Sequence, residues 1–188
     1  MRKFSTKFSH YFAIPCAVLG ACLGGCSAME PAPLPLTVAP EALRPPAPAV
    51  LALRTQANGV QIYGCTAAAD DAARFEWTLT APETDLFDEA GKRIGRHYAG
   101  PTWEALDGSK VVGEVQARAS ASDPGAIAWL LLAVKTNSGI GVLGQVQWIQ
   151  RLDTVGGKAP AAGCDAAHAG AEVRVPYKAS YYFYSAAH

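Results

Sequence analysis

The chain has 188 residues, with 16 basic and 16 acidic side chains, so its formal net charge is zero. Apolar residues make up 50% and charged residues 17%, a composition that supports one domain with a hydrophobic core and excludes a wholly disordered chain. Because there is no basic excess to neutralise phosphates, a dedicated nucleic-acid-binding role is not expected.

The N-terminal segment is typical of a bacterial lipoprotein signal. Residues 1–10 carry three basic side chains and no acid, and residues 11–25 are uncharged but shorter than the about 20 residues of a membrane-spanning helix. The letters LGGCS (23–27) resemble a lipobox, in which small residues precede a lipid-accepting cysteine. We therefore predict a lipoprotein signal peptide over residues 1–25 and lipidation of Cys26.

Two alternatives to this anchor exist in the same segment. The letters LGAC (19–22) form a weaker second lipobox, and ordinary cleavage after Ala28 would give a soluble secreted protein. Ser27, rather than an acidic residue, follows the cysteine and resembles lipoproteins sent to an outer membrane. We expect a protein anchored in the bacterial cell envelope, at the outer membrane facing the periplasm.

A proline-rich segment follows the predicted lipid site. Seven prolines fall within residues 27–48, and such a run favours extended polyproline II over a packed core. We therefore predict residues 26–48 as the lipidated cysteine and a linker, and residues 49–188 as a single domain. Loss of the basic signal leaves this mature chain mildly acidic, which further disfavours binding to anionic lipid or nucleic acid.

Cysteine usage points to an oxidising compartment. Once the signal and the lipidated cysteine are set aside, Cys65 and Cys164 are the two thiols of the domain. Two lone thiols in an exported domain most often pair, and this pair would close a long loop worth roughly 4.7 kcal/mol at the upper end. The alternative is two separate buried thiols. No CxxC spacing indicates a zinc site or a redox pair.

The domain reads as a series of short strands. Residues 75–79 alternate between apolar and polar, and residues 89–92 (EAGK) predict a turn. Asp107-Gly108 then predicts a two-residue type I′ hairpin between residues 102–106 and 109–117, with Leu106 opposite Ser109 and Trp103 opposite Val112.

The later segments complete an all-β pattern. Residues 126–134 (AIAWLLLAV) are apolar on both faces and predict a buried strand. In residues 146–152 every second side chain shares a face, and residues 177–184 place Tyr177, Ala179, Tyr181 and Phe183 on one side. The opposite side of that last strand is either an exposed tyrosine platform or a second buried face. We predict an all-β fold, a mostly antiparallel two-layer β-sandwich.

One glycine-rich motif is misleading. Residues 139–144 (GIGVLG) fit the dinucleotide-binding pattern G-x-G-x-x-G, but that site needs a helix directly after the loop. The following residues read as a strand, so we expect a hairpin loop, no dinucleotide and no other cofactor.

Functional side chains concentrate in residues 97–109. His97, Trp103, Glu104 and Asp107 form the candidate ligand site, and their spacing matches no common metal site. His97 oriented by either carboxylate could act as a base, whereas in a purely structural interpretation Asp107 serves the turn, Trp103 serves the core and His97 is a buried strand residue. We assign no catalytic residue and no metal.

Several segments together resemble the domain of unknown function 3455 family of exported bacterial and fungal proteins. They are GVQIYGC (59–65), HYAGPTWEALDGSKVVG (97–113), WLLL (129–132), IQRLDTVGGKAP (149–160), GCD (163–165) and VPYKASYYFY (175–184). The resemblance spans about residues 42–185 and implies a secreted β-rich domain. It also places Cys65 and Cys164 at the family's two cysteine positions and implies no assigned activity.

The sequence therefore favours a lipid-anchored envelope protein with a disulfide-stabilised β domain. We expect a non-catalytic binding or structural module whose partner is an envelope polysaccharide or a protein. The alternative is a small secreted hydrolase or metal-dependent enzyme that uses His97, Glu104 and Asp107. The two differ in whether the His97 imidazole reaches a carboxylate in an open cleft or is enclosed by core side chains.

Overall fold

The computed structural model describes residues 38–187, which form eight β-strands and two short 3-10 helices, so the all-β prediction is confirmed. The strands are β1 (Ala49–Ala67), β2 (Phe75–Phe87), β3 (Arg93–Tyr98), β4 (Thr102–Ala105), β5 (Lys110–Ala119), β6 (Trp129–Ser138), β7 (Val146–Gly156) and β8 (Glu172–Ala186). The 3-10 helices are η1 (Glu41–Leu43) and η2 (Ala166–His168). Within these described residues, no helix is long and apolar enough to span a bilayer.

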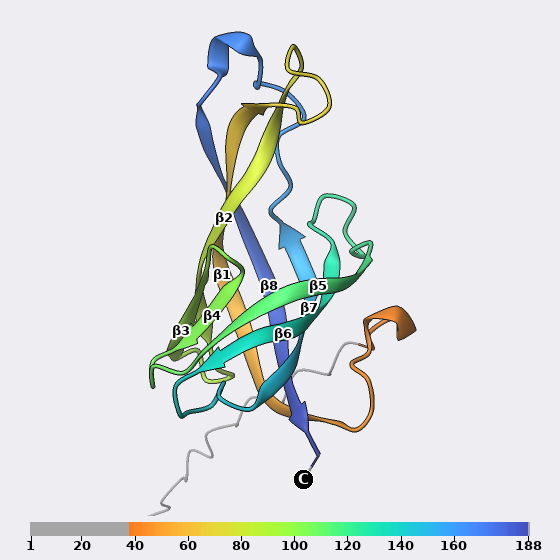
Figure 1. Cartoon of the computed structure of the whole chain (residues 1–188), viewed down its shortest axis with the longest axis vertical. Helices are drawn as coiled ribbons and strands as arrows, with labels where there is room; N and C mark the ends of the chain where they lie inside the picture. The colour runs from red at the N-terminus through yellow and green to blue at the C-terminus, as the bar shows by residue number, and fades with distance from the viewer. Residues whose placement is uncertain (1–37, 188) are drawn as a thin grey trace, which may run out of the picture. The chain divides into compact units, whose positions relative to one another are not determined.

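The strands close into a single antiparallel barrel in the order β1 to β8 (Figure 1). Closure depends on β1, which pairs with β2 along one side and with β8 along the other. The two layers of the predicted sandwich are therefore replaced by one closed sheet. Closure gives each barrel strand two neighbours and encloses an interior, while the part of β2 before Thr84 pairs with β1 alone.

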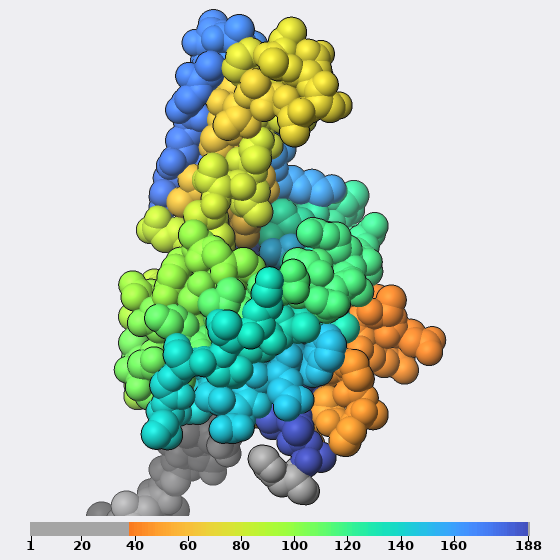
Figure 2. Space-filling model, in the orientation of Figure 1, coloured from red at the N-terminus to blue at the C-terminus, as the bar shows by residue number. Residues whose placement is uncertain are grey.

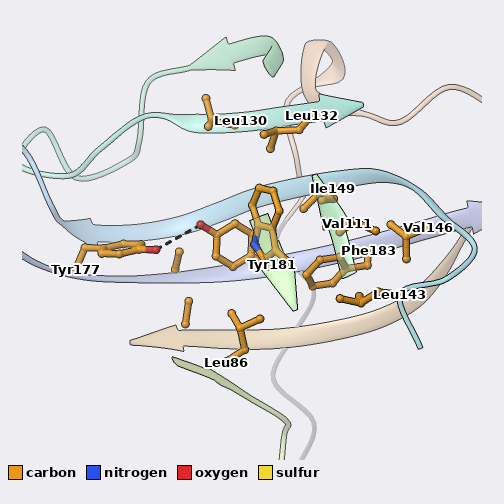
Figure 3. Packing of buried hydrophobic residues seen from close by; sticks show 13 residues of the cluster. Leu86, Val111, Leu130, Leu132, Leu143, Val146, Ile149, Tyr177, Tyr181 and Phe183 are labelled. Carbon is orange, nitrogen blue, oxygen red and sulfur yellow. Dashed lines mark hydrogen bonds between the residues drawn. The ribbon is translucent and has the colours of Figure 1, made fainter. Parts of the chain in front are cut away.

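The interior is filled at one end by large apolar side chains. Figure 3 shows a group of these side chains from β7, β8 and the β6–β7 loop, each at most 1% exposed: Leu143, Val146, Ile149 and Phe183. The side chains predicted to share a face of β8, from Tyr177 to Phe183, all belong to this inner cluster. The period-2 pattern of residues 177–184 thus identifies the inner face correctly.

A second cluster covers the outer face of β6 to β8. It consists of Leu43, Trp129, Leu131, Leu152 and Tyr182. Leu43 of η1 is completely buried, and its carbonyl accepts a hydrogen bond from the Gln150 side chain. Residues 39–43 therefore belong to the folded domain, although we expected the linker to extend to residue 48. Tyr182 is 2% exposed, so this face offers no open tyrosine platform.

The buried strand predicted over residues 126–134 is β6, displaced toward the C-terminus. Leu130 and Leu132 pack in the inner cluster, while Trp129 and Leu131 pack in the outer one, so both faces are buried as expected. In β7 the predicted shared face breaks at Val146, which joins the inner cluster, because the register shifts between Val146 and Trp148.

The predicted hairpin forms, but its register differs by one residue. Trp103 pairs with Val111, and the Gly108 amide donates to the Ala105 carbonyl, so the loop has three residues. Gly108 has a φ of 84°, whereas Asp107 is not among the positive-φ residues, which a type I′ turn would require. The Asp107 carboxylate instead accepts from the Ser109 amide at 2.8 Å and from the Val142 amide at 2.9 Å.

The glycine-rich segment 139–144 is the loop between β6 and β7, as expected. Its backbone passes so close to the Asp107 carboxylate that a Cβ at Gly141 would collide with it. A strand, β7, follows this loop. The glycines therefore permit close packing of two loops, and the helix that a dinucleotide site needs does not follow.

The long strands β1, β2 and β8 extend beyond the barrel as an arm (Figures 1 and 2). The predicted disulfide lies in this arm and joins Cys65 of β1 to Cys164 in the loop before β8, with the Cα atoms 5.4 Å apart. Backbone hydrogen bonds from Cys65 to Ala171 and from Gly170 to Cys65 hold the same two segments together. The disulfide thus stabilises the arm rather than the barrel wall.

Leu43→Ala should lower the free energy of unfolding by about 2–5 kcal/mol, because it leaves a cavity under η1 in the outer cluster. Urea denaturation measures this loss. Leu106→Ala is the matched control, since Leu106 is 64% exposed and its truncation should change stability by less than about 0.5 kcal/mol. Equal effects of the two substitutions would show that residues 39–43 do not pack stably on the barrel.

Candidate functional site

A cavity of about 230 Å³ lies inside the barrel, at the end nearer the arm. Its apolar walls come from Leu79 and Ala81 of β2, Pro101 of the β3–β4 turn, and Leu130 and Leu132 of β6. Its polar groups are the side chains of Gln61, Thr80, His97, Arg118, Arg151 and Tyr181. Apolar walls with a few polar groups are the usual composition of a small-molecule site.

The strand register places two arginines in one row across the barrel. Arg118 of β5 pairs with Leu130 of β6, Leu130 pairs with Arg151 of β7, and Arg151 pairs with Tyr181 of β8. All four line the cavity. Arg151 points inward because it lies two residues after Ile149 and therefore on the same face of β7. Ile149 is fully buried in the inner cluster.

Arg151 is held by a backbone carbonyl and by no acid. Its Nε and Nη2 donate to the Ala128 carbonyl at 3.2 and 2.9 Å. No Asp or Glu of residues 38–187 forms an ion pair with Arg151, and the cavity lining contains no acidic residue. Burial lowers the pKa of His97, and the positive charge of Arg151 adds to this effect. Burial raises the pKa of Tyr181, and the same charge partly offsets that rise. The inner surface of the cavity is therefore cationic.

Two further side chains of the lining carry buried donors without a partner. Gln61 is 2% exposed and Trp103 is 1% exposed, and neither Gln61 Nε2 nor Trp103 Nε1 has a hydrogen-bond partner among the described residues. Unpaired buried donors cost free energy and are rare in folded proteins. Their position beside a cavity that also holds Arg151 makes this end of the barrel interior rich in donors.

His97 lies against this cavity as a buried neutral base. Its ring stacks on Trp103 with centroids 4.1 Å apart, and its Nδ1 lies 2.9 Å from the Thr102 carbonyl. Because a carbonyl only accepts, Nδ1 must carry the proton, which leaves Nε2 with a lone pair. Burial lowers the pKa of His97 to about 3, so the ring is uncharged at neutral pH.

Two tyrosines continue the polar interior beyond the cavity. Tyr177 accepts a hydrogen bond from Thr84 at 2.8 Å, and its hydroxyl lies 3.5 Å from that of Tyr181, as the dashed line in Figure 3 shows. Burial raises the pKa of both tyrosines. Both hydroxyls are therefore neutral, and they supply no negative charge to compensate Arg151.

The two carboxylates of the predicted site lie elsewhere. Glu104 occupies the opposite strand face from Trp103 and accepts from Tyr98 at 2.7 Å and Arg96 at 2.9 Å, and these bonds lower its pKa. Asp107 is committed to the β4–β5 turn, where bonds from the Ser109 side chain and the Val142 and Ser109 amides lower its pKa. Of the four predicted site residues, only His97 and Trp103 line the cavity.

This arrangement does not bring His97, Glu104 and Asp107 together. Within residues 38–187 no group of three or more His, Cys, Asp or Glu side chains could hold a metal ion. The enclosed position of His97 beside Trp103 and Tyr181 matches the structural interpretation of this residue. The predicted lipid site at Cys26 and the signal peptide lie outside the described residues.

The sequence does not predict three polar residues of the cavity lining: Gln61, Arg118 and Arg151. For Arg151 a usable signal exists, because Ile149 and Arg151 fall on the same face of a strand whose other face carries Gln150 and Leu152. For Gln61 and Arg118 the sequence gives no comparable indication of which face of the strand is buried. Their positions depend on how β1 and β5 pair with strands far away in the sequence.

Comparison with known proteins identifies a family. The model of a family described as "Protein of unknown function (DUF3455)" covers residues 46–185. No curated protein and no solved structure matches the chain.

The neutral state of His97 makes stability depend on pH. Its pKa is about 3 in the folded protein and near 6.5 in the unfolded chain, so acid favours the unfolded state. The free energy of unfolding should be unaffected by His97 above pH 6.5. Below that pH it should fall by up to about 1.4 kcal/mol per pH unit, reaching about 5 kcal/mol near pH 3.

Urea denaturation between pH 7 and 4.5 measures this slope, with His97→Asn as the comparison. Asparagine can still donate to the Thr102 carbonyl but does not titrate, so the variant should lack the His97 contribution. Parallel pH profiles for the two proteins would contradict a buried neutral imidazole.

Proposed function

The chain belongs to the DUF3455 family, whose description assigns no activity, and we propose that it is an exported, non-catalytic binding module held to the cell envelope by a lipid on Cys26. The barrel interior is the binding site in this proposal. It takes up one small molecule at the end of the barrel nearer the arm.

The observation that carries the proposal is the contrast between the two ends of the interior. One end is packed with Leu143, Val146, Ile149 and Phe183, while the other holds a cavity of about 230 Å³. Eight-stranded barrels either fill their interior with side chains or hold one small ligand. A cavity lined by apolar walls, an arginine and unpaired donors fits the second case.

The size of the cavity limits the class of ligand. Sites for drug-sized molecules range from about 300 to 1,000 Å³, so this one suits a smaller molecule. An envelope polysaccharide or a protein partner would have to bind on the outside of the barrel. The alternative hydrolase gains no support from the geometry, since His97 is bonded to a backbone carbonyl and Glu104 faces away from Trp103 and the cavity.

Export and anchoring rest on the sequence, with one supporting observation from the fold. Disulfides form and persist outside the reducing cytosol, and Cys65 and Cys164 are paired. Because residues 39–43 pack on the barrel, the proposed linker between Cys26 and the domain is shorter than the sequence indicates.

Uptake of a small molecule can be followed at the indole N–H of Trp103. In a nitrogen-15 NMR titration with a neutral and a charged aromatic probe, benzamide and benzoate, at least one probe should shift this signal. The Trp77 indole is an internal control, because it lies on the arm and donates to the Ala162 carbonyl. Ala81→Phe, which fills the cavity, should abolish the shift. No shift with either probe, or equal shifts of both indoles, would contradict an accessible cavity.

Lipidation should appear as an acylated Cys26 at the N-terminus of the mature protein in mass spectrometry of membrane extracts. Cys26→Ser should release the protein into the soluble fraction, because acyl chains supply the membrane affinity. Cys22→Ser is the matched control and should leave the protein anchored. A mature protein that begins after Ala28 without lipid would contradict the anchor.

A further inference from the structure

We infer that the cavity selects a small carboxylate with a compact apolar body, whose carboxylate pairs with the Arg151 guanidinium. This inference rests on the proposed function and adds the chemical class of the ligand. It follows from the charge of the lining, its supply of donors, and its size.

The charge of the lining is unbalanced. Arg151 lies inside the barrel, and Arg118 stands at the exposed rim of the same cavity. Neither arginine forms an ion pair with any acidic residue of the described chain, and the lining has no Asp or Glu. Because Arg151 is partly buried, its charge is incompletely hydrated, and an anion entering the cavity would gain a charge-assisted hydrogen-bond partner there.

The guanidinium is positioned rather than free. Two of its nitrogens donate to the Ala128 carbonyl, and the fork of an arginine has five N–H donors in all. The remaining donors can meet the two oxygens of a carboxylate, a geometry that arginine matches well. Because the side chain is already held by β7 and by Ala128, little conformational entropy is lost when the anion binds.

The other polar groups also favour an acceptor. The unpartnered atoms of the lining, Gln61 Nε2 and Trp103 Nε1, are both donors. An ionised carboxylate only accepts hydrogen bonds, whereas an alcohol, an amide or an amine brings donors that have few acceptors here. His97 Nε2 offers one acceptor position beside this donor-rich surface.

The apolar walls and the volume of the cavity determine the size and character of the rest of the ligand. The part of the cavity away from the polar groups is lined by apolar side chains, namely Leu79, Pro101, Leu130 and Leu132. A dry cavity of about 150 Å³ accepts a benzene ring, so about 230 Å³ accommodates a ring of that size with a carboxylate attached. Phosphate carries more charge and a larger hydration cost into the same apolar walls, and it fits the site less well.

Isothermal titration calorimetry with benzoate and its neutral isostere benzamide tests this selectivity. Benzoate should bind roughly 10-fold or more tightly than benzamide, the range expected for hydrogen bonds to a charged group. Arg151→Gln should remove this preference by lowering the affinity for benzoate to that for benzamide, and an unchanged near-UV circular dichroism spectrum shows that the variant is folded. Arg74→Gln is the matched control, because Arg74 pairs with Asp70 and Glu76 on the arm.

The outcomes separate this inference from the proposed function. Equal affinities for the two probes, a preference that persists in Arg151→Gln, or tighter binding of inorganic phosphate than of benzoate would each overturn the carboxylate assignment and leave the binding site in place. Failure of both probes to bind the native protein at millimolar concentration would overturn the proposed function as well. Loss of the preference in Arg74→Gln would show that general surface charge, and not Arg151, attracts the anion.

Discussion

The proposed site depends on one guanidinium, that of Arg151, which lies partly buried on the inner face of a closed sheet and forms no ion pair with an acidic residue of the described chain. Closure through β1 and β8 fixes which side chains face inward, and alternation in β7 places Arg151 on that inner face together with Ile149. The fold balances the charge only through the Ala128 carbonyl and neutral tyrosine hydroxyls. Such an interior is poor for stability alone, and its composition is that of a site made for an anion.

The rest of the molecule can be understood as support for that interior. Apolar side chains fill the far end of the barrel, and η1 seals the outer face of β6 to β8 through Leu43. The Cys65–Cys164 disulfide lies in the arm, where Cys65 of β1 pairs with Trp77 of β2. Much of the apolar packing thus lies away from the cavity, although Leu130 and Leu132 belong both to the inner cluster and to the cavity wall.

Sequence reasoning identified the strands, the disulfide and the buried face of β8, because alternation and cysteine usage are local or compositional signals. It could not distinguish a sandwich from a barrel, since both bury one face of each strand, and closure depends on pairing between β1 and β8 at opposite ends of the domain. Proximity in sequence groups four residues as a candidate site, and the structure places only two of them, His97 and Trp103, at the cavity. Neighbours on a strand point to opposite faces, so Trp103 and Glu104 separate, while Arg151 and Tyr181 join from distant strands.

The position at which an anion binds tests most directly whether Arg151 holds the ligand. Anomalous diffraction from crystals soaked in 4-bromobenzoate would locate the bromine and the carboxylate together. We expect one bromine site inside the barrel among Leu130, Leu132 and Pro101, with the carboxylate on the Arg151 guanidinium. Bromine sites confined to the outside of the barrel, or an interior molecule whose carboxylate points away from Arg151, would contradict the account.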